Sequence, residues 1–174
     1  MSPERLARYH DFTRRHGINW PVYIVARLFL TPFFAIYFRW VRNGREHGRV
    51  RGGLIVASNH RSFLDPFVIG ALLPWRRQFQ FVAKIELFEN RLQGWFLSRL
   101  GAFPIRRGQS DETAVETARL AVERGGTVVI FPEGTRIRQG SLARPKRGVG
   151  RLALESGVPV MPVAVIGTEH VRNG

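Results

Sequence analysis

Two short apolar runs in this chain each lead directly into a polar segment, and this repeated arrangement constrains the fold more than any other feature. Leu54 to Ala57 leads into the septet Asn59-His60-Arg61-Ser62-Phe63-Leu64-Asp65. Thr127 to Phe131 leads into Pro132-Glu133-Gly134-Thr135-Arg136. Short β-branched runs are typical of buried strands. If the two strands are parallel, both polar segments leave the sheet at the same edge, where open α/β sheets bind ligands.

Strand-like and helix-like segments alternate along the rest of the chain. Further strand-like segments cover residues 79–83, 103–105 and 158–166. Helices are predicted over residues 66–73, 86–100 and 110–124 and within 145–156. This alternation predicts an α/β fold with a largely parallel sheet flanked by helices. We expect the globular domain to cover residues 50–174.

His60 and Asp65 are the candidate catalytic pair of the first polar segment. A histidine changes charge near neutral pH, and a carboxylate can fix its tautomer and stabilise the imidazolium. Residues five apart on a regular helix point about 140° apart, so the two side chains meet only if the backbone turns between them. Pro66 favours this turn, because proline prefers the first helical turn and makes Asp65 the predicted N-cap. The alternative is a structural histidine beside a helix cap.

The chain is strongly basic, with 27 Lys and Arg residues against 13 Asp and Glu residues and a net charge of +14. This charge predicts an anionic partner, which is a nucleic acid, an anionic membrane or a phosphorylated substrate. The absence of cysteine excludes disulfides and thiol catalysis and argues against a zinc site, so we expect no metal. We also expect no secretory signal, since no apolar stretch precedes residue 18.

Residues 18–41 form an apolar and aromatic segment that follows a polar, basic start. Arg27 interrupts the segment and Pro32 would bend it, so it lacks the long uncharged run of a spanning helix. We predict that residues 1–45 dock on a membrane surface, with Arg39, Arg42 and Arg45 facing anionic lipid. The alternative is a helix that packs in the core of the domain.

Arginines follow the third strand-like segment and close the second polar segment. Gly101 to Gly108 contains Arg106 and Arg107, and Arg136 ends the other loop. A guanidinium can hold two phosphate oxygens at once, and Gly134 would let the backbone approach a ligand. Arg107 and Arg136 are therefore predicted to bind one phosphate. The alternatives are solvated surface charges, and an ion pair for Glu133.

Four segments stand in the order and approximate spacing of the motifs of the glycerolipid acyltransferase family. They are the pair His60 and Asp65, Gly101 to Arg107, Phe131 to Arg136, and Val158 to Val163. Over residues 50–169 the chain resembles the bacterial 1-acylglycerol-3-phosphate acyltransferases. The resemblance implies their fold, with His60 as general base, Asp65 as its partner and Pro159 in a motif linked to acyl-donor binding. It also implies an acceptor-binding set of Arg107, Glu133, Gly134, Thr135, Arg136 and Lys146.

The resemblance implies acyl transfer from acyl-CoA or acyl carrier protein to the free hydroxyl of 1-acylglycerol-3-phosphate. The product would be phosphatidic acid, made without a further cofactor at the cytoplasmic face of the membrane. The alternative acceptors are another lysophospholipid and glycerol-3-phosphate. Ser62 as a nucleophile is disfavoured, because the Gly-x-Ser-x-Gly elbow is absent. A basic membrane-surface or nucleic-acid binding module is the non-enzymatic alternative, although no nucleic-acid motif is recognised and no nucleic acid is expected.

Two positions and the length depart from the family pattern. Arg106 stands where relatives often carry an acidic residue, and Ile137 stands where a serine is usual, so the preference for the acceptor is less constrained. Relatives usually continue for several tens of residues beyond the fourth motif, whereas this sequence has Gly174 shortly after it. We therefore expect the domain to be truncated at its C-terminus.

Overall fold

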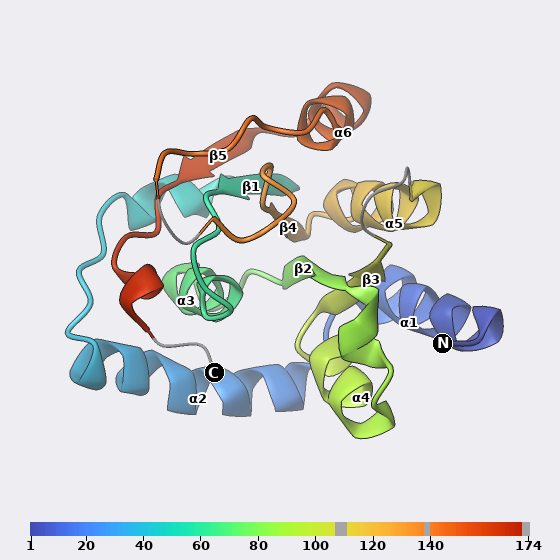
Figure 1. Cartoon of the computed structure of the whole chain (residues 1–174), viewed down its shortest axis with the longest axis horizontal. Coiled ribbons are helices and arrows are strands. Elements are labelled where there is room, and N and C mark those ends of the chain that lie inside the picture. Colours follow the sequence, from blue (N-terminus) through green and yellow to red (C-terminus); the bar gives the residue numbers. More distant parts are fainter. Residues whose placement is uncertain (107–110, 138–139, 172–174) are drawn as a thin grey trace.

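A parallel β-sheet forms the centre of the computed structural model, which describes residues 1–106, 111–137 and 140–171. Its strands are β1 (Leu54–Ser58), β2 (Phe79–Lys84), β3 (Ala102–Ile105), β4 (Thr127–Ile130) and β5 (Val160–Val163). They lie in the order β3-β2-β4-β1-β5, and each neighbouring pair is parallel (Figure 1). The predicted α/β fold with a largely parallel sheet is confirmed. The last strand is shorter than the strand-like segment 158–166.

Six α-helices flank the sheet in the part of the chain that the structure describes. They are α1 (Pro3–His16), α2 (Trp20–Tyr37), α3 (Asp65–Leu72), α4 (Arg91–Arg99), α5 (Glu112–Glu123) and α6 (Gly148–Ser156). Shorter 3-10 helices cover Arg45–Arg49, Ile85–Phe88 and Thr168–His170.

The single helix predicted over residues 86–100 is wrong, because the chain forms a 3-10 helix and then starts α4 afresh. Asn90 makes the break: its side chain accepts a hydrogen bond from the backbone N–H of Gln93 at 3.1 Å and caps α4. A capping side chain satisfies an N–H group that lacks a partner within the helix, so it favours a new helix start at this position.

Helices cover both faces of β1, as its apolar sequence predicts. Successive strand residues point to opposite faces of a sheet. Leu54 and Val56 belong to a buried cluster with Ile69 of α3, whereas Ile55 belongs to a second cluster with Val122 of α5. The ends of β1 and β4 are therefore held firmly between two hydrophobic layers, which gives the loops that follow them a fixed starting point.

The first two helices pack against the sheet domain. α1 contacts α5 and β3, where His10 Nδ1 lies 2.9 Å from Thr117 Oγ1. α2 contacts α3 through Arg27, whose guanidinium donates a 2.6 Å hydrogen bond to the Leu73 carbonyl and weaker ones to the Ala71 and Pro74 carbonyls. The charge that interrupts the apolar segment thus satisfies carbonyl groups at the end of α3, while the opposite side of α2 is exposed.

Candidate active site

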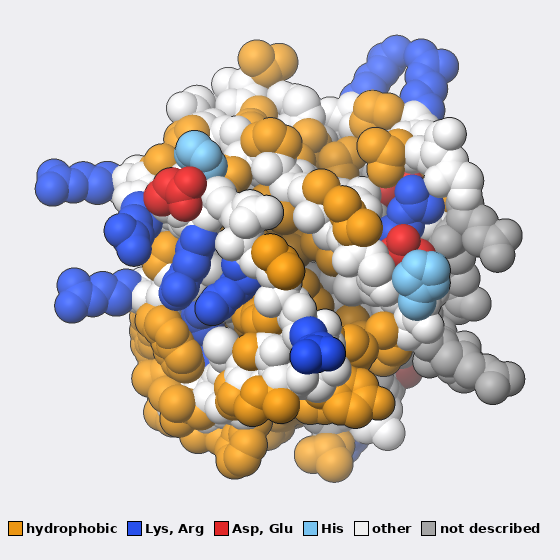
Figure 2. All heavy atoms as spheres, turned by 90° about the vertical axis from the view of Figure 1, so that its left-hand side faces the viewer, with side chains coloured by type: hydrophobic (Ala, Val, Ile, Leu, Met, Phe, Trp, Pro, Cys, Tyr) orange, Lys and Arg blue, Asp and Glu red, His pale blue; other side chains and the backbone are white. Residues whose placement is uncertain are grey.

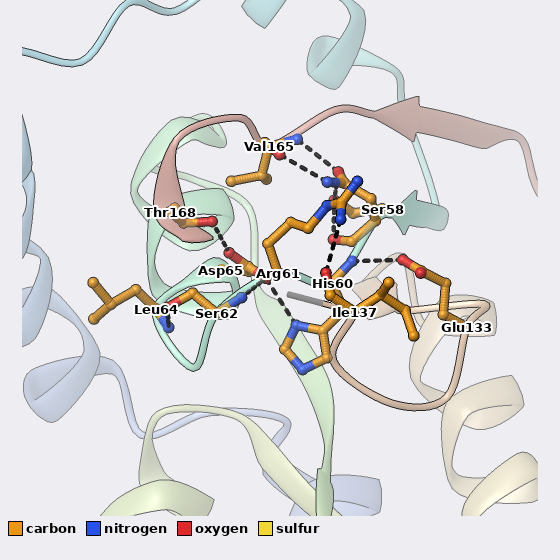
Figure 3. A network of polar contacts seen from close by, with 11 residues as sticks. Ser58, His60, Arg61, Ser62, Leu64, Asp65, Glu133, Ile137, Val165 and Thr168 are labelled. Carbon is orange, nitrogen blue, oxygen red and sulfur yellow. Dashed lines mark hydrogen bonds and ion pairs between the residues drawn. The ribbon is translucent and has the colours of Figure 1, made fainter. Parts of the chain in front are cut away.

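His60 and Asp65 meet immediately after β1, where the chain turns into α3. His60 Nδ1 lies 2.8 Å from Asp65 Oδ2 (Figure 3). The predicted turn between them is confirmed, but the predicted N-cap is wrong. Leu64 occupies the cap position, and Asp65 is the first residue of α3. Its carboxylate points back into the turn, because the backbone N–H groups of Arg61 and Ser62 donate to Oδ2 at 2.7 and 2.8 Å.

Asp65 is a buried carboxylate with a hydrogen bond on each oxygen. In addition to the three donors at Oδ2, the Thr168 hydroxyl donates to Oδ1 at 2.6 Å. Burial raises the pKa of Asp65, but the hydrogen bonds from His60, Ser62, Thr168 and Arg61 outweigh it, and the pKa lies below its ordinary value. The group is therefore ionised at neutral pH.

An ionised Asp65 fixes the tautomer of neutral His60. A carboxylate only accepts hydrogen bonds, so Nδ1 of His60 must carry the proton and Nε2 must carry a lone pair. Nε2 points away from Asp65 (Figure 3). The ring is held by stacking on Phe131, with centroids 4.0 Å apart and an angle of 19° between the planes. This arrangement can take a proton at Nε2 and stabilise the resulting imidazolium at Nδ1.

The loop after β4 holds the backbone of His60 from both sides. Glu133 is buried, and its Oε1 accepts the His60 N–H at 2.8 Å, while the Ile137 N–H donates to the His60 carbonyl at 2.8 Å. Glu133 Oε2 accepts the Ala143 N–H at 3.2 Å. Because both oxygens of Glu133 are bonded to backbone N–H groups, the geometry gives this residue a positioning role. The prediction that the two polar segments share one sheet edge is confirmed.

A cavity of about 390 Å³ lies beside the His60 ring. Apolar side chains of the strand ends and of α5 and α6 line it, including Val82, Ile105, Ile130, Ala118 and Leu152. Basic side chains also line it, namely Arg106, Lys146, Arg147 and Arg151. An apolar cavity with cationic groups and a base suits a molecule that carries a hydrocarbon chain and an anionic group.

The predicted acceptor-binding residues lie at different places. Gly134 and Lys146 line the cavity, and Gly134 adopts a positive φ of 68° in a position where a Cβ atom would lie 2.8 Å from the Lys146 side chain. Thr135 and Arg136 are exposed on the same loop and do not line this cavity. Arg107 lies outside the described residues, so its predicted pairing with Arg136 on one phosphate stays a prediction.

Two polar residues of this region were not predicted from the sequence to support the site. Thr168 was not singled out, although its hydroxyl contacts Asp65. Asn59 was noted only as a member of the septet, whereas its side chain forms two hydrogen bonds with the backbone of Val165. No local signal marks these contacts, since both bring together residues more than 100 positions apart. Within the described ranges, no group of three or more His, Asp and Glu side chains is arranged to hold a metal ion.

The chain is similar to known acyltransferases. The model of the Acyltransferase protein family matches residues 40–166. The 1-acyl-sn-glycerol-3-phosphate acyltransferase BAT2 of Brassica napus is 35% identical over 119 residues, which cover 67% of this chain and 34% of that protein. A lyso-ornithine lipid O-acyltransferase of Pseudomonas aeruginosa is 37% identical over 117 residues, which cover 66% of this chain and 43% of that protein. The chain thus spans less than half the length of these two relatives.

A solved structure with the same architecture comes from Thermotoga maritima. It is the crystal structure of the 1-acyl-sn-glycerophosphate acyltransferase PlsC, which superposes with a TM-score of 0.65 and 25% sequence identity. The match covers 95% of this chain and 75% of the PlsC chain. The likeness therefore includes α1 and α2 as well as the sheet domain.

Proposed function

This chain belongs to the Acyltransferase family, and from that premise we propose that it transfers a fatty acyl group to the free hydroxyl of 1-acylglycerol-3-phosphate. The observation that carries the proposal is the 2.8 Å contact between His60 and an ionised, buried Asp65 at the end of β1. The names of the relatives support the choice of acceptor. The acyl donor is the thioester of coenzyme A or of acyl carrier protein, and the product is phosphatidic acid.

The reaction is a direct acyl transfer with His60 as general base. Nε2 of His60 takes the proton of the acceptor hydroxyl while the oxygen attacks the thioester carbonyl. The new C–O bond forms, the C–S bond breaks, and the departing thiolate takes the proton from the imidazolium. Asp65 stabilises the imidazolium through Nδ1. Ser62 is a poor nucleophile in this site, because it is fully buried and its hydroxyl accepts the Leu64 N–H at 3.3 Å.

Cationic side chains beside the cavity bind the acceptor phosphate in this proposal. Lys146, Arg106 and Arg147 share the cavity with His60, so a phosphate bound there places the glycerol hydroxyl near Nε2. The free energy of phosphate binding then holds the acceptor hydroxyl close to the base and to the thioester carbonyl. Arg136 and Arg107 would complete the phosphate site from the neighbouring loops, as the family resemblance implies.

The outward side of α2 is the proposed membrane-docking surface. Val25, Leu28, Phe29, Ile36 and Tyr37 are among its exposed residues. Figure 2 views the end of the molecule where α2 finishes: hydrophobic side chains cover the lower part, and basic side chains lie next to them. Apolar side chains bordered by arginines suit the interface of an anionic leaflet, and we place the protein on the cytoplasmic one.

A shallow position of α2 fits its contacts better than a plain span. By length and composition α2 is long enough to cross a bilayer, a property that core helices of soluble proteins share. Its inner side carries Arg27, which is buried against α3.

A flotation experiment tests the docking surface. Replacing Phe29 and Ile36, on the exposed side of α2, by serine should abolish flotation with anionic liposomes, whereas Leu154→Ser on the exposed side of α6 should not. Complete flotation of the double variant would place the anchor elsewhere.

A thiol-release assay tests the catalytic proposal. Acyl-CoA is supplied with a panel of acceptors that contains 1-acylglycerol-3-phosphate, glycerol-3-phosphate and lyso-ornithine lipid. We expect acceptor-dependent thiol release that is greatest with 1-acylglycerol-3-phosphate and absent from the His60→Ala protein. A preference for lyso-ornithine lipid, the substrate named in one relative, would replace the proposed acceptor. Wild-type release by the His60→Ala protein would overturn the assignment of the base.

A further inference from the structure

We infer that Thr168 is a positioning residue for the proposed reaction, because its hydroxyl holds the second oxygen of Asp65 while the first faces His60. The inference rests on the proposed function, since it concerns the orientation of the partner of the base. Thr168 opens the 3-10 helix after β5, two residues beyond the end of the family match at residue 166.

The two oxygens of Asp65 are held from different parts of the chain. Oδ2 accepts from His60, Arg61 and Ser62, all within the local turn. Oδ1 accepts from Thr168, 103 residues away, at 2.6 Å. The torsion about the Cβ–Cγ bond of an aspartate is soft, so donors to one oxygen alone leave the plane of the carboxylate free to rock. The Thr168 hydroxyl fixes this plane, and with it the direction of the lone pair that faces His60.

Asp65 depends on this hydroxyl because the carboxylate is fully buried. Within the described part of the chain, the Thr168 hydroxyl supplies the hydrogen bond that Oδ1 accepts. A buried carboxylate oxygen without a donor loses the interaction that replaced its hydration. The carboxylate would then turn toward other donors or admit water, and either change moves it away from its contact with His60.

Asn59 brings Thr168 into place. Its side-chain amide donates to the Val165 carbonyl at 2.7 Å, and its amide oxygen accepts the Val165 N–H at 2.7 Å. The ladder between β1 and β5 ends with Ser58 opposite Val163. The Asn59 side chain therefore continues the pairing by two further hydrogen bonds and directs the chain after β5 across the start of α3. Asn59 directly precedes His60 in the chain. The same residue therefore holds both the segment that carries the base and the segment that carries Thr168.

Valine and serine replacements separate the hydroxyl of Thr168 from its shape. Thr168→Val keeps the branched shape and removes the donor, whereas Thr168→Ser keeps the donor and removes a methyl group. We expect Thr168→Val to lower kcat about tenfold to a hundredfold, the range for loss of a hydrogen bond to a charged group. The KM values for acyl-CoA and acceptor should change less than about twofold. Thr168→Ser should keep kcat within about threefold of wild type.

Control variants identify the cause of any loss. Thr113→Val makes the same change at an exposed site on α5 and should leave kcat unchanged. Asn59→Ala should lower kcat as Thr168→Val does, and the double variant should lose less than the product of the two effects, because both changes release the same support. A wild-type kcat in Thr168→Val, or an equal loss in Thr168→Ser and Thr168→Val, would overturn the inference.

A spectroscopic measurement keeps the inference independent of turnover. The proton on His60 Nδ1 gives an NMR signal that is assigned by its absence in His60→Ala. We expect this signal to persist in Thr168→Ser and to be lost or displaced in Thr168→Val, because the acceptor of this proton is no longer fixed. An unchanged signal in Thr168→Val would show that Asp65 needs no support from Thr168. If the wild-type protein shows no acceptor-dependent thiol release, the proposed function fails, whereas the signal still decides whether Thr168 positions Asp65.

Discussion

His10 and His60 occupy surroundings that are alike in packing and unlike in charge. Both are buried, and each ring lies against a phenylalanine, Phe103 for His10 and Phe131 for His60. Each Nδ1 also has one close oxygen. For His10 it is the Thr117 hydroxyl at 2.9 Å, and for His60 it is the Asp65 carboxylate at 2.8 Å.

The oxygen partner decides what each buried histidine can do. Thr117 donates its hydroxyl proton to the Thr113 carbonyl at 2.7 Å, so it accepts a hydrogen bond from His10 without compensating a positive charge. Burial lowers the pKa of His10 from 6.5 to about 4, with Asp111 opposing the shift and Arg14 and Arg106 adding to it. His10 is therefore neutral at physiological pH. At His60 the ionised carboxylate can stabilise an imidazolium, which is the property that a general base requires.

The largest expected effect comes from removing the histidine that has the carboxylate. His60→Ala should lower kcat about 10³- to 10⁴-fold, near the upper end of what a general base contributes. His10→Asn should leave kcat near wild type, because asparagine can still donate to Thr117 and His10 lies outside the cavity beside His60. Thiol release by both purified variants, with circular dichroism as a check on folding, measures the difference. Equal losses in the two variants would remove the contrast between the histidines.

The second-largest expected effect is a loss of stability in acid. It is caused by His10, the buried histidine that has no carboxylate partner. Between pH 6.5 and about 4 the unfolded chain binds a proton at His10 and the native protein does not, so stability falls as the pH falls through this window. The loss is about 3 kcal/mol, since each unit of pKa difference corresponds to about 1.4 kcal/mol. The pKa of Asp65 is lowered, so its own contribution is lost only at more acidic pH, below its unfolded value of about 3.9.

Denaturant unfolding at a series of pH values measures this loss. The His10→Asn protein should show a flatter dependence of unfolding free energy on pH between about 6.5 and 4, although it is less stable at neutral pH because the ring leaves a gap. A dependence as steep as that of the wild type would assign the acid sensitivity to other groups.

The pattern of strands and polar segments predicted the sheet and the meeting of the two loops. β1 and β4 are neighbours and parallel, so a local feature at the end of each strand was enough to bring His60 and the Glu133 loop together. The turn between His60 and Asp65 was also a local feature, marked by Pro66. These parts of the site could be predicted because each depends on one short segment. The parallel direction of β1 and β4 brings the two loops together, and the short turn brings Asp65 to His60.

The remaining parts depend on contacts that no local pattern records. α1 was not predicted, because its sequence is strongly polar and two of its three buried residues, His10 and Thr13, are polar as well. Thr168 and Asn59 act through β5, which is more than 100 residues from β1 in sequence and pairs with it at the edge of the sheet. Glu133 was predicted to bind substrate, but a buried carboxylate can equally hold backbone N–H groups, and residue type does not distinguish the two uses.

A smaller effect is expected at the cation that shares the cavity with His60. Lys146→Ala should raise the acceptor KM at least about tenfold and change the acyl-CoA KM little, because it removes one charge-assisted contact with phosphate, worth about 1.5–3 kcal/mol. Arg136→Ala should raise the acceptor KM less, since Arg136 does not line this cavity. Steady-state kinetics with each substrate varied in turn separates the two constants. An equal rise in both KM values for Lys146→Ala would indicate a structural role.

The smallest expected effect tests whether Glu133 supports His60 or binds the acceptor itself. Glu133→Gln keeps one acceptor oxygen but turns an NH₂ group toward a backbone N–H, at either His60 or Ala143. The unfolding free energy should fall by about 1–2 kcal/mol, the cost of one unsatisfied buried group. For a chain of this size, the melting temperature should fall by several degrees.

Since Glu133 touches the backbone of the base, kcat of Glu133→Gln should fall a few-fold while the acceptor KM stays within about twofold of wild type. A rise in the acceptor KM with unchanged stability would instead place Glu133 among the groups that contact the acceptor, as the family resemblance implied, and would leave the His60 backbone dependent on Ile137 alone.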